Sequence, residues 1–284
     1  MRILVFGQSG QVARELARAA PEARCLARDE ADLSDPAACA RRIAQSDPQI
    51  VINAAAFTAV DAAESDEVQA RRINVEAPAA MARAAAARAI PLLHVSTDYV
   101  FDGSGTRPWR PDDAPAPLNA YGRTKLAGEA GVRAADGPHA ILRSSWVFSA
   151  HGTNFVRSML RLGRTRDRLA IVADQIGGPT PASDIAYALL SMARTFHEGR
   201  GVSGTYHFSG APETSWADFA RAIFAQAGLA VQVDDIPSTD YPTPAPRPLN
   251  SRLDCSSLQA DYGLTRPDWR AGLAEVLKEL DSAT

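Results

Sequence analysis

The sequence predicts an α/β protein, with a doubly wound parallel sheet and a smaller lobe assembled from discontinuous parts of the C-terminal half. Two observations support this prediction: short apolar runs alternate with helical patterns through the first half, and the pattern loosens after Ser149. Alternating strands and helices imply right-handed crossovers and therefore parallel strands. A chain of 284 residues is long enough for one large domain and a smaller appendage.

Buried strands are expected where apolar residues run without interruption. These segments are residues 2–6, 24–27, 49–53, 91–96, 139–143 and 204–208. Helices are expected near residues 11–20, 35–45, 75–89, 121–134, 154–163, 183–195, 216–227 and 269–280. The second of these helices has a clear start, because Ser34 and Asp35 precede Pro36, which is tolerated in a first helical turn.

The composition argues against several classes of partner. A net charge of -3 and a pI near 6.0 give no electrostatic footprint for nucleic acid or an anionic membrane. Cys25, Cys39 and Cys255 are odd in number and widely spaced, which indicates free thiols in a reducing compartment. The first apolar run ends at Gly7, too early for a secretory signal, and no stretch is apolar enough to span a bilayer. We therefore expect a soluble, cytoplasmic protein.

A glycine pair follows the first expected strand and opens the first expected helix, in the segment GQSGQVA at residues 7–13. Glycines allow a tight turn and a close backbone approach to a pyrophosphate, which the helix N-terminus then faces, as in Rossmann-type dinucleotide sites. Ala13 stands at the third glycine position and is small enough for close packing. A plain strand-to-helix turn is the alternative.

The end of the second strand normally selects between dinucleotides. An acidic residue there binds the ribose 2′-hydroxyl of NAD, whereas Arg suits the 2′-phosphate of NADP. Here Arg28 follows the strand directly and Asp29 is adjacent. The sequence thus favours NADPH through Arg28 and leaves NADH open; Asp32 and Leu33 are expected beside the adenine, with a simple turn as the alternative.

Tyr121 and Lys125 form a Tyr-x-x-x-Lys pair in a chain whose only lysines are at positions 125 and 278. On a helix, residues four apart share one face, so the phenol and the ammonium can converge. A nearby cation favours phenolate and lowers a tyrosine pKa from its reference of about 10. We therefore expect Lys125 to make Tyr121 a usable proton donor near neutral pH. An exposed helix with an ordinary Tyr and a solvated Lys is the alternative.

Two further segments carry a family resemblance: NAAAFTAVD at residues 53–61 after the third strand and STDYVFDG at residues 96–103 after the fourth. With the Tyr/Lys pair, they resemble the extended short-chain dehydrogenase/reductases, and within that superfamily the dTDP-4-dehydrorhamnose reductase family. The segments SWVF (145–148), TNFVR (153–157), DQIGGPT (174–180) and RPLNSRLD (247–254) extend the resemblance over nearly the whole chain. Ala13 and Arg28 depart from the pattern and affect only the expected cofactor preference.

The resemblance implies an NADPH-dependent oxidoreductase that reduces the C4 ketone of dTDP-4-dehydro-L-rhamnose to dTDP-L-rhamnose. This is the last step of dTDP-rhamnose biosynthesis, which supplies cell-surface polysaccharides such as lipopolysaccharide. It also implies a catalytic set of Thr97, Tyr121 and Lys125. Thr97 would bind the carbonyl oxygen, Tyr121 would protonate the alkoxide, and Lys125 would also hold the nicotinamide ribose.

The resemblance further assigns binding residues. The expected cofactor contacts are Gly7, Gly10, Gln11, Val12, Arg28, Asp32, Leu33, Ala54, Ala55, Ala56, Phe57, Thr58, Tyr121 and Lys125. The expected substrate contacts are Thr58, Val60, Thr97, Asp98, Tyr99, Trp146, Asn154 and Arg247. Asn154 and Arg247 would face the nucleotide diphosphate, and the Trp146 indole would pack on the sugar. A core Trp146, a surface ion pair of Arg247 and simple packing of the three alanines are the alternatives.

The expected division of the chain follows from these assignments. Residues 1–150 would form the dinucleotide-binding domain, with return segments near 178–208, and residues 151–177 and 209–284 would form the nucleotide-sugar-binding lobe. The five histidines show no metal-ligand spacing, so no metal site is expected. A homodimer is possible, since some members of the family dimerise through a metal held by surface carboxylates, which the sequence does not locate here.

Two other functions stay open. A nucleotide-sugar epimerase or 4,6-dehydratase would share the scaffold, but dehydratases place Glu after the Asp that follows the catalytic Thr, and here Asp98 is followed by Tyr99. Elimination is therefore disfavoured, whereas epimerisation is not. A non-catalytic, cofactor-binding regulatory subunit is the other alternative; the intact Thr97, Tyr121 and Lys125 set argues against it.

Overall fold

The strands expected from the apolar runs form one parallel sheet. The computed structural model describes residues 1–282 and contains a six-stranded sheet in the order β10-β5-β4-β3-β1-β2. Its strands are β1 (Ile3–Phe6), β2 (Arg24–Leu26), β3 (Ile50–Asn53), β4 (Leu92–Thr97), β5 (His139–Ser144) and β10 (Gly204–His207). Every neighbouring pair runs parallel. The predicted fold class is confirmed, and each strand begins and ends within one residue of its expected position.

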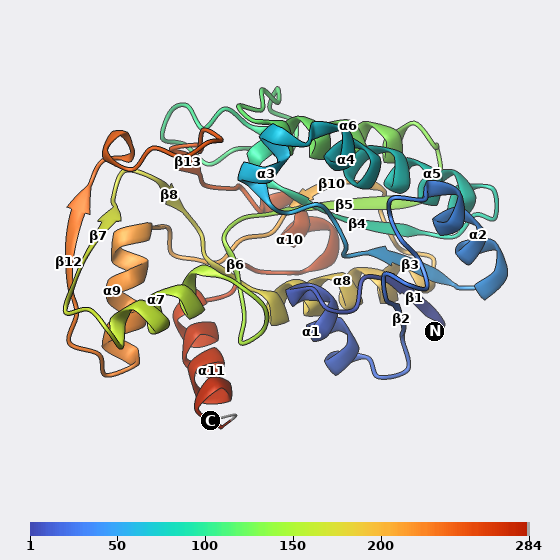
Figure 1. Cartoon of the computed structure of the whole chain (residues 1–284). Helices are drawn as coiled ribbons and strands as arrows, with labels where there is room; N and C mark the ends of the chain where they lie inside the picture. Colours follow the sequence, from blue (N-terminus) through green and yellow to red (C-terminus); the bar gives the residue numbers. More distant parts are fainter. Residues whose placement is uncertain (283–284) are drawn as a thin grey trace.

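Helices cover both faces of this sheet, as a doubly wound arrangement requires (Figure 1). On one face lie α2 (Pro36–Ser46), α5 (Ala77–Ala86) and α6 (Ala120–Arg133), and on the other lie α1 (Gln11–Ala19) and α8 (Ala182–His197). Alternate residues of β1 serve the two faces: Ile3 and Val5 pack in the core under α1 and α8, Leu4 and Phe6 in the core under α2 and α5. The strands read as continuous apolar runs because they are buried on both faces.

The crossover from β3 to α5 is more segmented than the sequence predicted. Three short helices precede α5: α3 (Val60–Ser65), α4 (Glu67–Arg71) and the π-helix η1 (Arg72–Glu76). Asn74 lies inside the π-helical turn and is fully buried. Single π-helical turns occur often near functional sites, and this one faces α6.

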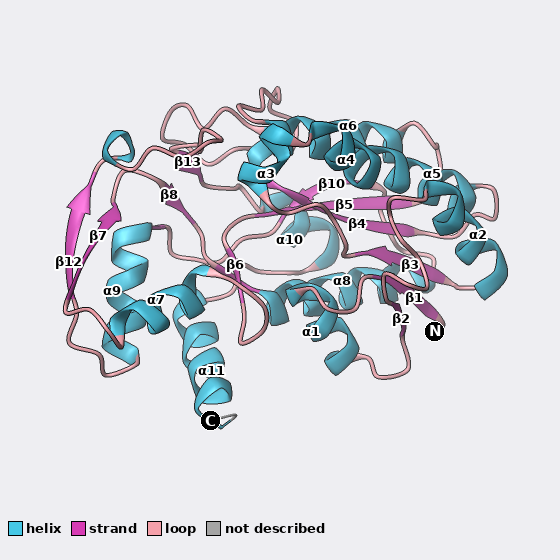
Figure 2. Cartoon of the chain, viewed as in Figure 1, coloured by secondary structure: helices cyan, strands magenta, loops and turns pink. Residues whose placement is uncertain are grey.

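The smaller lobe lies at one end of the sheet (Figure 2). It contains α7 (Phe155–Gly163), α9 (Trp216–Gln226), α11 (Trp269–Ser282) and a parallel pair of strands, β7 (Arg168–Val172) and β12 (Gln232–Ile236). Its core is aromatic, with Phe148, Phe219 and Trp269 buried together.

Short strands join the lobe to the sheet. β6 (Val147–Phe148) pairs with β9 (Thr180–Pro181), and β8 (Ile176–Gly177) lies between β11 (Thr214–Ser215) and β13 (Asn250–Ser251). Two 3-10 helices, η2 (Asp98–Val100) and η3 (Ser238–Asp240), complete the described elements.

One helix differs from the expected division of the chain. Residues 209–284 were assigned to the lobe, but α10 (Ser256–Tyr262) packs against α8 and β10, and Leu258 belongs to the core beneath the sheet. Its seven residues are too short for a clear helical period, so the sequence did not place it.

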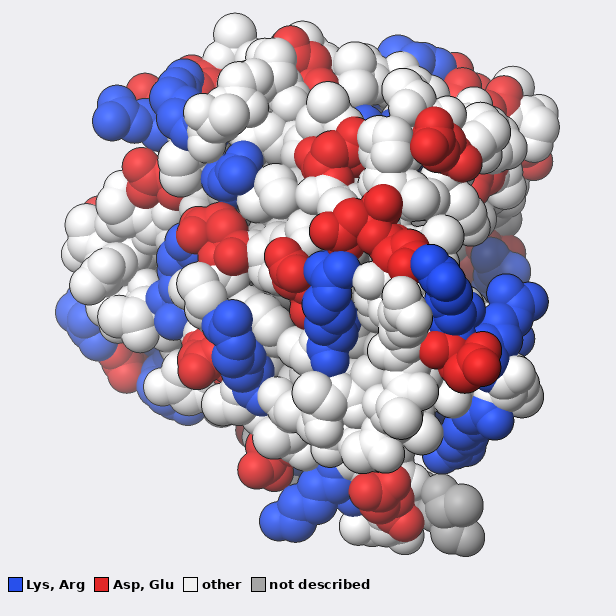
Figure 3. Space-filling model, turned by 90° about the vertical axis from the view of Figure 1, so that its left-hand side faces the viewer, with Lys and Arg blue, Asp and Glu red and all other residues white. Residues whose placement is uncertain are grey.

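On the face drawn in Figure 3, acidic and basic side chains are interspersed over the described residues. None of the helices in residues 1–282 combines the length and apolarity needed to cross a membrane.

Candidate active site

Thr97 and Tyr121 meet where β4 ends and α6 begins. The Asn119 side chain caps α6 by accepting a hydrogen bond from the Gly122 N–H at 2.8 Å. A Cβ atom on Gly122 would lie 2.1 Å from the Tyr99 carbonyl oxygen, so the lack of a side chain lets α6 approach η2 closely. The Tyr99 and Tyr121 rings then pack edge to face, with centroids 5.7 Å apart. The Thr97 hydroxyl, which donates to Asp98 Oδ1 at 3.1 Å, lies close enough to the Tyr121 phenol to lower its pKa.

The expected effect of Lys125 on Tyr121 is wrong for this structure. Burial raises the pKa of Tyr121 to about 12; the nearby Thr97 hydroxyl lowers it, and the charge of Asp98 raises it. Lys125, only 2% exposed, donates to the Val95 carbonyl at 2.8 Å, and its Nζ lies 3.4 Å from His94 Nε2. Burial lowers the pKa of Lys125 to about 8, against the opposing charge of Glu129. Desolvation of the phenolate therefore outweighs the attraction of a cation that is directed at β4.

Asp98 adds a carboxyl group beside the two hydroxyls. It is 4% exposed, accepts a hydrogen bond from Thr97 Oγ1 at 3.1 Å, and its Oδ2 atom has no partner within residues 1–282. Burial raises its pKa to about 6, and the nearby Ser251 and Thr97 hydroxyls oppose the shift. Asp98 Oδ2 and Ser251 Oγ are both buried without a partner at hydrogen-bond distance among residues 1–282, which is costly for polar groups.

The loop after β1 can accommodate a dinucleotide. Gly7 has φ +116°, and a Cβ atom there would lie 3.4 Å from the Cβ atoms of both Ala13 and Ala55. Gly10 precedes α1 without any side-chain cap, so the first N–H groups of that helix have no such acceptor. These features fit a pyrophosphate at the start of α1.

The neighbouring side chains have other partners. Gln11 Oε1 accepts hydrogen bonds from Ser149 Oγ and Asn154 Nδ2, both at 2.9 Å, and Val12 is buried in the core. Both residues can meet a dinucleotide at this position through their backbone. The Gln11 side chain connects α1 to the loop that precedes α7.

Arg28, Asp32 and Leu33 lie beyond the end of β2. Arg28 is exposed and forms no ion pair or ring contact within residues 1–282, but its charge lowers the pKa of Asp32. The pKa of Asp32 is lowered, chiefly by the hydrogen bond from the Ser34 N–H and to a smaller extent by Arg28. Leu33 is buried with Leu26 in the core under α2. The Arg28 side chain is thus the one of these three that is freely accessible.

The loop after β3 is held by a residue that sequence reasoning missed. Asn74 accepts from the Phe57 N–H at 2.8 Å and donates both to the Phe57 carbonyl and to Thr124 Oγ1, each at 3.1 Å. The loop is thereby attached to α6. Its predicted cofactor residues are accessible to different degrees: Ala54, Ala55, Ala56 and Phe57 are half-buried, and Thr58 is exposed just before Val60 begins α3.

Trp146 contributes an aromatic surface at the junction with the lobe. Its backbone has φ +50°, and its ring stacks on Trp216 with centroids 3.6 Å apart and planes 12° apart. Trp216 is fixed in turn by donating from Nε1 to Gln175 Oε1 at 3.1 Å. One face of Trp146 is therefore covered by protein, and only its other face or its edge can meet a sugar.

The two residues expected at a diphosphate both have protein partners. Asn154 caps α7 and donates to Gln11, Ser149 and His151, which uses its amide group. Arg247 forms an ion pair with Asp61 at 2.9 Å. Its charge also lowers the pKa of Tyr99, which lies beside the proposed catalytic residues. Their contacts with a diphosphate stay predictions.

A second buried cluster stabilises α6 against the sheet. Arg143 donates twice to the Glu129 carboxylate, at 2.8 and 2.7 Å, and Ser96 Oγ donates to it at 2.6 Å. Burial opposes ionisation, but these hydrogen bonds and the Arg143 charge hold the pKa of Glu129 below its usual range. A sequence signal existed, since Glu129 continues the spacing of four from Tyr121 through Lys125.

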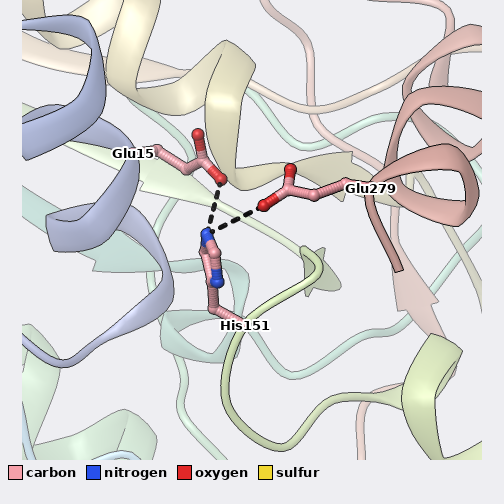
Figure 4. A group of neighbouring side chains, drawn as sticks. All are labelled: Glu15, His151 and Glu279. Carbon is pink, nitrogen blue, oxygen red and sulfur yellow. Dashed lines mark ion pairs between the residues drawn. The ribbon is translucent and has the colours of Figure 1, made fainter. Parts of the chain in front are cut away.

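Glu15, His151 and Glu279 come together from α1, the loop before α7, and α11 (Figure 4). His151 Nε2 lies 3.5 Å from Glu15 and 3.4 Å from Glu279, and one ligand atom from each residue falls within 4.8 Å of the others. The sequence had predicted no metal site, but this geometry could hold a cation. Arg18 already pairs with both carboxylates, at 2.5 Å for Glu15 and 3.1 Å for Glu279.

Comparison with known proteins identifies relatives that match the chain over its full length. The chain is 43% identical over 278 residues to a dTDP-4-dehydrorhamnose reductase of Sinorhizobium fredii, covering 95% of this chain and 94% of the relative. The crystal structure of a dTDP-4-dehydrorhamnose reductase from Clostridium acetobutylicum is 35% identical and superposes with a TM-score of 0.93, covering 99% of this chain and all of that one.

A second solved structure carries a cofactor. A dTDP-4-dehydrorhamnose reductase from Bacillus anthracis, crystallised with NADP, is 32% identical with a TM-score of 0.92 and covers 98% of this chain and 99% of that one. The family described as "RmlD substrate binding domain" matches residues 1–282. With full-length relatives above 30% identity and the same fold, the chain belongs to the RmlD substrate binding domain family.

Proposed function

We propose that the chain is an NADPH-dependent oxidoreductase that reduces the C4 ketone of dTDP-4-dehydro-L-rhamnose, giving dTDP-L-rhamnose. The observation that carries this proposal is the meeting of the Thr97 and Tyr121 hydroxyls at the carboxyl end of β4, with Lys125 buried one turn further along α6. Ligands bind at the carboxyl ends of strands in sheets of this type. The names and full-length similarity of the relatives support the same reaction.

The proposed roles follow from the hydrogen-bonding capacity of each group. When bound, the reduced nicotinamide supplies the hydride for C4. The Thr97 and Tyr121 hydroxyls would donate to the ketone oxygen as negative charge develops there. Tyr121 would then transfer its proton to that oxygen; a pKa of about 12 keeps the phenol protonated before this step. Lys125 would bind the ribose hydroxyls and favour the resulting phenolate.

NADPH is proposed as the preferred dinucleotide because Arg28 is accessible at the end of β2, where a 2′-phosphate would lie. Asp29 is equally exposed, so NADH is expected as a weaker substitute. The B. anthracis relative that was crystallised with NADP supports this order. We also propose a cytoplasmic location, where nicotinamide and nucleotide-sugar pools are found; a homodimer stays a prediction.

The test is a spectrophotometric assay of reduced-nicotinamide consumption with enzymatically prepared dTDP-4-dehydro-L-rhamnose. Stoichiometric oxidation of NADPH, with dTDP-L-rhamnose as the product, is expected. Retention of a tightly bound dinucleotide without net oxidation would instead favour an epimerase. Binding of dinucleotide with no conversion of any sugar nucleotide would favour a regulatory subunit and overturn the proposal.

A further inference from the structure

A chain of buried polar side chains leads from the loop after β3 to Lys125. Asn53 and His94 are register partners on β3 and β4, so their side chains lie on the same face of the sheet. Both are buried, and Asn53 Nδ2 lies 3.1 Å from His94 Nδ1. His94 Nε2 in turn lies 3.4 Å from Lys125 Nζ.

The Ala55 N–H determines which groups donate and which accept hydrogen bonds along this series of side chains. The Ala55 N–H can only donate, and it donates to Asn53 Oδ1 at 3.2 Å. The amide group of Asn53 therefore faces His94 with its NH₂, so His94 Nδ1 must be the unprotonated acceptor. Burial, and then the charge of Lys125, hold the pKa of His94 well below its usual value. The ring is neutral near pH 7, and its one proton lies on Nε2.

This tautomer directs an N–H at Lys125. An ammonium has three N–H groups and no lone pair, whereas a neutral amine can accept a hydrogen bond. The bond from Lys125 to the Val95 carbonyl can form with either, so the contact with His94 favours the neutral amine. The nearby charges do not reverse this preference for the neutral amine. Glu129 on α6 favours the ammonium, but its carboxylate is paired with Arg143 of β5. The charge of Asp98 in η2 raises the pKa of Tyr121.

We propose that Asn53 fixes His94 in the tautomer protonated on Nε2, and that His94 is thereby a positioning residue that determines when Lys125 is charged. Lys125 then behaves as a group that gains or loses its proton in the working pH range, instead of a permanent cation. Only the kinetic consequence rests on the proposed function: turnover that needs the Lys125 ammonium should fall as the pH rises through about 8.

Nuclear magnetic resonance can test this proposal directly, because the chain has only two lysines. Protein labelled with ¹³C at lysine Cε gives two signals, and Lys278→Arg, on the exposed side of α11, assigns them. Labelling histidine with ¹⁵N reports which ring nitrogen carries the proton. In the unaltered chain we expect His94 protonated on Nε2 and a Lys125 midpoint near 8. A proton on Nδ1 overturns the proposal without any variant.

Asn53→Asp is the most informative change. A carboxylate keeps the shape of the amide and still accepts from Ala55, but its second oxygen must also accept, which moves the His94 proton to Nδ1. His94 Nε2 then accepts from the Lys125 ammonium. We expect the Lys125 midpoint and the alkaline limb of the turnover profile to rise together by at least about one pH unit. Asn53→Leu removes the side chain that selects the His94 tautomer, without adding charge. The Lys125 midpoint and the alkaline limb of the turnover profile should both rise by less than in Asn53→Asp.

Two control variants separate this effect from simpler ones. In a His94→Phe background, Asn53→Asp should move the Lys125 midpoint much less, because only the through-space charge remains; an equal shift would refute the role of His94. Ser96→Ala removes a different polar contact from β4 to α6, the hydrogen bond to Glu129, and should leave the His94 spectrum unchanged. The spectra need no turnover, so an inactive chain with the expected tautomer would contradict only the proposed function.

Discussion

The two ends of α6 carry buried polar groups on one face of the helix, at a spacing of four residues, but their surroundings differ. Toward its C-terminal end, Glu129 is matched by two hydrogen bonds from Arg143 and one from Ser96. At the N-terminal end, Tyr121 and Lys125 lie near Asp98, whose Oδ2 atom has no partner in the described chain.

The pKa directions separate the two ends. The pKa of Glu129 lies below its usual range, so its charged form is the stable one. The pKa values of Asp98 and Tyr121 are raised and that of Lys125 is lowered, so burial moves all three toward their neutral forms. Buried polar groups that satisfy one another stabilise the fold, whereas groups left incompletely paired mark a place for a ligand.

The largest expected effect tests the incompletely paired end. Tyr121→Phe keeps the ring packing against Tyr99 but removes the proton donor, so turnover should fall by roughly 10²–10⁴-fold while NADPH binding persists. Steady-state kinetics and a dinucleotide titration measure the two quantities. Tyr187→Phe, on the exposed side of α8, is the matched control and should leave both unchanged. Normal turnover of Tyr121→Phe would remove its phenol from the mechanism.

At the fully paired end, the expected loss is in stability. Arg143→Leu leaves the buried Glu129 carboxylate with only the longer, partly exposed ion pair to Arg133, which should lower the free energy of unfolding by about 3–5 kcal/mol. Denaturant unfolding measures this loss, and adding Glu129→Leu should recover most of it. Arg168→Leu breaks an exposed pair with Asp234 and should cost no more than about 1 kcal/mol. Equal losses for the two single variants would mean that burial of the Glu129 pair is unimportant.

A smaller effect is expected from the pH dependence of stability. Asp98 has a pKa of about 6 in the folded chain, above its ordinary unfolded value of about 3.9. The folded state therefore binds this proton more tightly than the unfolded state does. The unfolding free energy that protonation of Asp98 contributes is complete below about pH 4 and is lost as the pH rises to 6.

Asp98→Asn removes this dependence. Relative to the unaltered chain, the variant should gain on the order of 2–3 kcal/mol of unfolding free energy between pH 4 and pH 6, and no more above that window. Thermal or denaturant unfolding over pH 3.5–8 would show it. A constant difference between the two proteins across this range would contradict the raised pKa of Asp98.

The smallest expected effect concerns an exposed charge, Arg28, outside both clusters. Arg28→Ala should weaken NADPH binding by roughly tenfold or more, the value of one charged hydrogen bond, and leave NADH nearly unaffected. Titration with each dinucleotide measures the ratio. Arg24→Ala, at an exposed residue of β2 that pairs with Glu30, is the control. Equal weakening of both dinucleotides would refute the contact with the 2′-phosphate.

Much of the fold was predictable because its signals are local. The six strands are short apolar runs, and α2, α6 and α7 begin directly after capping residues that the sequence displays. The short helices between β3 and α5 were not predicted, because a π-helical turn and two helices of five or six residues leave no sustained period.

For the site, the sequence identified the groups but not their charge states. The spacing of Tyr121 and Lys125 correctly placed both on one helix face, yet the sign of the Tyr121 pKa shift was wrong. That sign depends on how completely the phenol is desolvated and on where the ammonium points, and both are set by tertiary packing. For His94 the sequence indicated only that it belongs to no metal-ligand pattern, since its pairing with Asn53 requires knowledge of the strand register.

The ion pair between Arg247 and Asp61 has a consequence for how an anion could enter. Arg247 is already paired, because the Asp61 carboxylate accepts hydrogen bonds from its guanidinium and from the Ala245 N–H. A diphosphate arriving there would compete with the Asp61 carboxylate for the Arg247 guanidinium, and Asp61 would stay nearby as a like charge. Binding would therefore favour anions that form paired hydrogen bonds with the guanidinium over anions that offer charge alone.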